Sequence, residues 1–163
     1  MVQAHSATAQ PEIVAPVKRH RKTSGAAPPA KGGARSGSAR RLIGMAFEAN
    51  EGWSKARASQ LFERVAATSP LPTGKLRAEL IPDSSWKRAG KTLGPQASQT
   101  TARLGNILVV AERVWGNESD ATEWLNSPHP ELQGATPLSL LKTEAGGRAV
   151  EALLAALEFG FPV

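Results

Sequence analysis

The sequence predicts an all-α protein, built as a small helical bundle. Apolar residues recur at the three- and four-residue spacing of a buried helix face over residues 104–115 and again over residues 150–157. Helix start and stop signals border these segments, such as Thr136 followed by Pro137, Gly116 and Gly160. No pair of segments shows the alternating pattern of β-strands. With 163 residues, 40% of them hydrophobic, the chain suffices for one domain or two very small ones plus a tail.

The N-terminal quarter is predicted to be a disordered basic tail, residues 1–40. It is rich in Pro, Gly, Ser and Ala and holds few large apolar side chains, so burial cannot offset the entropy of ordering it. Residues 1–41 contain eight Lys and Arg against one acid, whereas residues 101–163 contain four against eight. A basic segment attracts polyanions such as nucleic acid. A solvated, solubilising tail explains the same charge equally well.

Residues 41–98 are predicted to form short helices. Residues 41–66 are predicted to be helical, with a break at Asn50-Glu-Gly52. A further short helix spans Lys75 to Leu80. Asp83 is expected to cap a third, basic helix. Two short helices joined by a tight turn fit a helix-turn-helix, although such pairs are common in other helical domains. The candidate DNA contacts are Ser84, Ser85, Trp86, Lys87, Arg88 and Lys91, of which Trp86 fits the core better.

Residues 99–163 carry the clearest helical pattern. A long helix from Ser98 to Gly116 has an apolar stripe wide enough to be buried by the core and by a second copy of the chain, which predicts a homodimer. Asp120 with Glu123 resembles a capping pair. It opens a helix that buries Trp124 and Leu125. Thr143 is expected to cap the last helix, which buries Val150, Leu153, Leu154 and Leu157.

The segment after the last helix reads Phe159-Gly-Phe-Pro-Val163. Two aromatic residues and a valine beyond a helix stop are either a contact for a partner or fold back on the core. Pro162 restricts the backbone, which lowers the entropy lost on insertion into a partner. On the polar side of the last helix, Arg148 and Glu151 are either partner contacts or a solvated face with one Glu144–Arg148 pair.

The sequence argues against an enzyme, a metal site and a bound cofactor. It has no cysteine, and its three histidines are scattered, so neither a metal cluster nor a catalytic triad is predicted. The glycines at 32, 33 and 37 lie in a low-complexity stretch and form no phosphate-binding loop. No apolar run approaches the roughly 18 residues of a membrane span. Nor does the N-terminus have the apolar region of a secretory signal, so we expect a cytoplasmic protein without membrane contact.

The C-terminal motifs resemble those of the Xre/MbcA/ParS family of antitoxins, over residues 75–163. The resemblance rests on a long helix ending in an aromatic residue and glycine (103–116), on Ala-x-x-Trp-Leu (121–125) and on Pro-x-Pro-x-Leu-x-Gly-x-Thr-Pro-Leu-x-Leu-Leu (128–141). It continues with Thr-Glu-x-Gly from Thr143 and closes at Gly160. The upstream region departs from the family, since Ser84-Ser-Trp-Lys-Arg88 stands at its Thr-x-x-Arg-Arg stretch and Ala97 replaces an acid.

This resemblance implies a helical, dimeric antitoxin with a C-terminal toxin-binding domain at 99–163 and a helix-turn-helix region at 41–98. Its partner would be a RES-domain toxin that consumes NAD or transfers ADP-ribose from it, and the complex would repress its own operon. The toxin-binding residues would be Arg148, Glu151, Phe159, Gly160, Phe161, Pro162 and Val163, with the last five covering or plugging the NAD cleft. A stand-alone Xre-type DNA-binding regulator is the alternative, and a helical interaction protein with a nucleic-acid-tethering tail is a third.

Overall fold

A computed structural model describes residues 52–160 of the chain. The basic tail, the segment up to residue 51 and the three residues Phe161, Pro162 and Val163 lie outside this range. Within it the protein is helical, which confirms the predicted fold class, and one isolated antiparallel bridge joins Ser54 to Thr92. The elements are α2 (Lys55–Ala66), α3 (Thr73–Leu80), α4 (Asp83–Arg88), α5 (Pro95–Trp115), α6 (Glu118–Asn126), the 3-10 turn η1 (Pro130–Leu132), α7 (Pro137–Leu140) and α8 (Glu144–Phe159).

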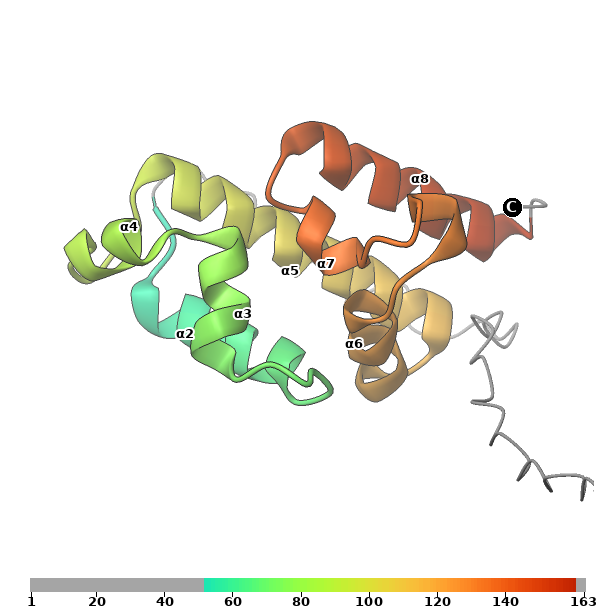
Figure 1. Ribbon diagram of the computed structural model, residues 1–163, viewed down its shortest axis with the longest axis horizontal. Helices are drawn as coiled ribbons and strands as arrows, with labels where there is room; N and C mark the ends of the chain where they lie inside the picture. Colours follow the sequence, from blue (N-terminus) through green and yellow to red (C-terminus); the bar gives the residue numbers. More distant parts are fainter. Residues whose placement is uncertain (1–51, 161–163) are drawn as a thin grey trace, which may run out of the picture.

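The long helix α5 organises the bundle. It packs on both α6 and α8, while α2 packs on α3 and α6. Figure 1 shows α2, α3 and α4 grouped at one end of the molecule and α6, α7 and α8 at the other, with α5 running between them. One apolar cluster runs through the described bundle from Trp53 to Leu154. The ends of the bundle are therefore joined by a shared core.

The helix boundaries follow local capping chemistry. Thr143 accepts a hydrogen bond from the Gly146 N–H, and Gly116 and Gly160 end their helices in the left-handed conformation, as predicted. The buried face of α8 is also confirmed for Val150, Leu153 and Leu154, with Leu157 partly buried against the same core.

Two predicted caps are wrong. Asp83 is the first residue of α4 and makes no capping bond, because its carboxylate instead pairs with the guanidinium of Arg77. The cap of α6 is Asn117, whose side chain accepts from the Asp120 N–H at 2.8 Å, so the predicted pair of Asp120 and Glu123 lies three residues too late. At α4 the carboxylate is engaged in an ion pair and no side chain caps the helix, whereas at α6 an earlier polar residue provides the cap.

Candidate functional site

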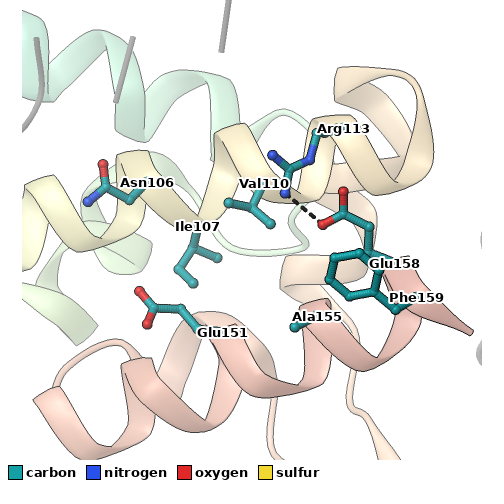
Figure 2. Close-up of a pocket in the computed structure, with 8 residues that line it drawn as sticks. All are labelled: Asn106, Ile107, Val110, Arg113, Glu151, Ala155, Glu158 and Phe159. Carbon is teal, nitrogen blue, oxygen red and sulfur yellow. Dashed lines mark hydrogen bonds and ion pairs between the residues drawn. The ribbon is translucent and has the colours of Figure 1, made fainter. Parts of the chain in front are cut away.

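A groove lies between α5 and α8 near the C-terminal end of both helices. It encloses about 570 Å³, and we refer to it as the α5/α8 groove. Figure 2 shows the side chains of the two helices facing each other across it. Its lining residues are Asn106, Ile107, Val110, Arg113, Glu151, Ala155, Glu158 and Phe159.

The α5/α8 groove has an apolar floor and two different polar ends. Its apolar residues include Ile107, Val110 and Ala155. At the end away from Phe159 lie Asn106 of α5 and Glu151 of α8 (Figure 2). At the other end Arg113 and Glu158 form a 2.6 Å ion pair beside Phe159. Such an apolar groove with a few polar groups at its rim is typical of a binding surface for a protein segment.

Phe159 is the conspicuous side chain of this surface. Its side chain is 70% exposed, and no other large hydrophobic residue between residues 52 and 160 is exposed. It stands on the last turn of α8, directly before Gly160 turns the chain with φ of 70°. An aromatic side chain that is largely exposed at the rim of an apolar groove is typical of a contact surface.

The width of the groove depends on how closely α8 approaches α5. A Cβ atom at Gly147 would lie 2.3 Å from Cδ of Arg103, and one at Gly146 would lie 2.1 Å from the carbonyl oxygen of Leu140. Only glycine allows these approaches without a rearrangement. In the same region, Nη1 of Arg103 donates to the carbonyl oxygen of Leu141 at 2.7 Å, which ties the loop before α8 to α5.

The structure brings together only some of the toxin-binding residues that the sequence predicts in the C-terminal part. Glu151 and Phe159 line the α5/α8 groove, and Gly160 follows directly after it. Arg148 does not line it: its guanidinium lies 3.1 Å from Glu144, and both side chains are about 70% exposed, at 70% and 72%. The remaining predicted residues, Phe161, Pro162 and Val163, lie outside the described residues.

A second polar surface surrounds α4. The indole of Trp86 lies between two cations, with Nζ of Lys55 5.4 Å and the guanidinium carbon of Arg77 4.8 Å from the ring centre. Its edge meets Phe62 at 6.1 Å. Trp86 is thus partly buried against the core and anchors α4. The hydrogen bond from Arg77 holds the pKa of Asp83 below its ordinary value of 3.8.

The other candidate DNA contacts lie outside this stack. Lys87, Arg88 and Lys91 are exposed, as is Ser84, whereas Ser85 is half-buried. Nε of Arg88 donates to the carbonyl oxygen of Ser84 at 3.4 Å, a bond within α4 that leaves the guanidinium at the surface. The cations of Lys55 and Arg77, by contrast, serve to hold Trp86 and the ends of α4. The basic residues around α4 therefore divide into an anchoring pair and an exposed set.

Comparison with known proteins finds similarity to one family of antitoxins. A sequence model described as the antitoxin Xre/MbcA/ParS C-terminal toxin-binding domain matches residues 110–160. A curated protein from Pseudomonas putida, named Antitoxin Xre, is 34% identical over 88 residues. The C-terminal part of the chain is therefore similar to the toxin-binding domain of the Xre/MbcA/ParS antitoxins. The aligned part is 52% of this chain and 55% of the relative, so the chain spans about half the length of the curated protein it matches.

The Xre/MbcA/ParS toxin-binding segment coincides with the groove. Residues 110–160 include every lining residue except Asn106 and Ile107, which lie one turn earlier on α5. Sequence reasoning missed the contribution of α5, namely Asn106, Val110 and Arg113, and it also missed Glu158 of α8, the partner of Arg113. The signal is present in the wide apolar stripe of α5, which includes Ile107 and Val110. The sequence predicts a second copy over that stripe, whereas in the structure Ile107 and Val110 line a groove within one chain.

No cluster of three or more His, Cys, Asp or Glu side chains that could hold a metal ion occurs between residues 52 and 160. In the same range, no helix combines the length and the apolar character needed to cross a membrane. The described residues present two candidate surfaces, the α5/α8 groove and the exposed basic set around α4.

Proposed function

We propose that this chain is an antitoxin, which binds a toxin protein through the α5/α8 groove and the C-terminal end of α8. The observation that carries the proposal is the exposed Phe159 ring at the rim of an apolar groove, inside the segment matched as a toxin-binding domain. Exposed aromatic residues beside apolar pockets supply most of the binding energy in many protein interfaces. Glu151 adds a carboxylate at the far end of the same groove.

The proposed toxin has a RES domain and uses NAD as its substrate. Phe159 and the residues that follow, Gly160 to Val163, would cover or plug its NAD cleft. Support comes from the position of Phe159 on the last turn of α8, where the left-handed Gly160 directs the chain away from the helix axis. The chain's own part in this mechanism is steric: it excludes substrate and performs no reaction. Arg148 would add a charged contact from the exposed face of α8.

A direct test measures cellular NAD after expressing the protein encoded next to this chain, alone and together with it. Collapse of NAD alone and its preservation on co-expression would support the proposal. A chain lacking Gly160–Val163 should keep its fold, since the core ends at Leu154 and Leu157, but lose neutralisation. Full protection by that truncated chain would refute the plugging mechanism. The matched control is Glu123→Gln, which alters an exposed carboxylate of α6 outside the groove.

Operon repression is the second proposed activity, carried by the exposed basic set around α4. Lys87, Arg88 and Lys91 stand apart from the Trp86 stack and can meet phosphates or guanine edges, while Ser84 and Ser85 lie at the start of the helix. A homodimer would place two such surfaces on one operator. Equal affinity for operator and random duplex at moderate salt would leave only non-specific attraction.

The alternative function is a stand-alone Xre-type regulator in the cytoplasm whose C-terminal part serves only to dimerise. It is favoured if the neighbouring protein is harmless and forms no complex with this chain. Selective operator binding then distinguishes this regulator from a helical interaction protein that uses its basic tail as a tether.

A further inference from the structure

The acidic residues of α8 are Glu144, Glu151 and Glu158, each seven residues after the one before. Seven residues make almost two full turns of an α-helix, so the three carboxylates rise from one stripe of its surface. Glu144 pairs with Arg148 at 3.1 Å, and Glu158 pairs with Arg113 at 2.6 Å. The two outer carboxylates of the stripe are therefore neutralised by arginines of the same chain.

Glu151, the middle carboxylate of this stripe, differs from the other two. It is exposed, and it forms no ion pair with a cation between residues 52 and 160. In Figure 2 a dashed line joins Arg113 to Glu158, and none reaches Glu151, which lines the end of the α5/α8 groove away from Phe159. A carboxylate in water needs no partner. The absence of a cation matters only when a bound segment covers the groove.

A protein segment that fills the groove removes water from all of its lining residues. The apolar floor favours this, because burying apolar surface is favourable. Glu151 opposes it, because a carboxylate that loses its water without gaining a cation is strongly destabilised. The Arg113–Glu158 pair at the other end needs no further charge, since its two members already neutralise each other. A segment that fills the groove must therefore supply one cation, at the Glu151 end.

We propose that the toxin segment in the α5/α8 groove carries a Lys or Arg side chain that pairs with Glu151 and an apolar side chain that packs against Phe159. The two recognition points lie eight residues apart on α8, or about 12 Å at the rise of an α-helix. This inference rests on the proposed function, because it takes the occupant to be the toxin, and it adds the chemistry by which the groove selects that occupant. The acidic excess of residues 101–163, eight acids against four Lys and Arg, also attracts a basic segment at longer range.

Other occupants fit this chemistry less well. A second copy that docks through the same acidic half of the chain brings charges of the same sign, which repel. The basic residues 1–41 contain cations but few large apolar side chains to cover the floor of the groove. A toxin segment can supply the cation and the apolar side chain together.

The test measures the Kd between the full chain and the protein encoded next to it, by calorimetric titration. Glu151→Gln keeps the shape of the side chain and removes its charge, and it should raise the Kd at least about tenfold, because the toxin cation loses its partner. Its free energy of unfolding should match that of the wild-type chain, since Glu151 is exposed. The matched control is Glu123→Gln, an exposed acid of α6 outside the groove, which should bind as the wild-type chain does.

A double-mutant cycle identifies the cation. Each Lys and Arg of the neighbouring protein is replaced by Ala, and the Kd is measured with the wild-type chain and with Glu151→Gln. One of these replacements should weaken binding to the wild-type chain and have little further effect on binding to Glu151→Gln.

The sign of the Glu151→Gln effect separates the outcomes. Tighter binding would overturn the inference, because the carboxylate is then covered without a cation. Unchanged affinity would also overturn it, because the carboxylate then stays in water, and so would weaker binding with no Lys or Arg of the partner coupled to Glu151. These three results leave the proposed function intact, since the toxin still binds. If the wild-type chain and its neighbour form no complex, the proposed function fails and this inference fails with it.

Discussion

The side chain of Arg103 crosses directly over Gly147, where a Cβ atom would lie 2.3 Å from its Cδ. From this position Nη1 donates to the carbonyl oxygen of Leu141 at 2.7 Å. One arginine on α5 thus touches both α8 and the loop before it. The α5/α8 groove lies further along the same two helices.

Replacing Gly146 with alanine should destabilise the protein by about 1–3 kcal/mol, the usual cost of overpacking a core. Its Cβ would lie 2.1 Å from the Leu140 carbonyl oxygen, so backbone rather than a flexible side chain has to move. Gly147→Ala should cost less, since Arg103 can move aside and give up its bond to Leu141, at about 1 kcal/mol. Urea unfolding followed by circular dichroism measures both.

The control for these variants is Gly74→Ala, in α3, where nothing lies within 4 Å of the added Cβ. This change should be neutral or stabilise by about 0.4–1 kcal/mol, because alanine restricts the unfolded chain. If Gly146→Ala is as well tolerated as Gly74→Ala, the close approach of α7 and α8 is not a constraint in solution.

The contrast between these glycines shows what the sequence can predict. The roles of Thr143, Gly116 and Gly160 can be read from the sequence because a cap depends on residues within one turn. The need for glycine at 146 and 147 depends on Arg103 and Leu140, which approach only in the folded bundle. The groove escapes sequence reasoning for the same kind of reason, since its walls come from two helices that are separated in the sequence by α6, η1 and α7.

Phe159→Ala should separate stability from binding. The ring is 70% exposed, so its removal should change the free energy of unfolding by less than about 0.5 kcal/mol. If it is an anchor of the toxin interface, the same change should weaken the complex by about 2 kcal/mol or more, roughly thirtyfold. Calorimetric titration of the toxin with both chains measures this, and unchanged affinity would remove Phe159 from the interface.

Replacing Lys87 and Arg88 together by alanine should weaken operator binding without unfolding α4, whose anchor is the stack of Lys55, Trp86 and Arg77. For each phosphate that is no longer neutralised, the slope of log affinity against log salt should fall in magnitude by about 0.9. Fluorescence anisotropy with labelled duplex at several salt concentrations gives the slope. Arg148→Ala, which removes an exposed cation on α8, is the matched control and should leave the slope unchanged. Identical slopes for all three chains would place the DNA-binding residues elsewhere.

Asp83→Asn should change how stability depends on pH in the acidic range. The hydrogen bond from Arg77, and secondarily its charge, lowers the pKa of Asp83 in the folded chain below its ordinary value of 3.8. A carboxyl with a lowered pKa stabilises the fold above the unfolded value, and this contribution is lost as the pH falls through the folded value. The stability difference between wild-type and Asp83→Asn should therefore be constant near neutral pH and shrink below pH 3.8. Urea unfolding between pH 7 and about 2.5 measures it.

The Arg77→Gln background separates the effect of this arginine on Asp83 from that of other cations. In chains that carry Arg77→Gln, the difference in unfolding free energy between Asp83 and Asp83→Asn should no longer depend on pH, because the donor that lowers the pKa of Asp83 is gone. A pH dependence that persists there would mean that Asp83 acts through another partner. Lys87 is the candidate, because its charge also lowers the pKa of Asp83.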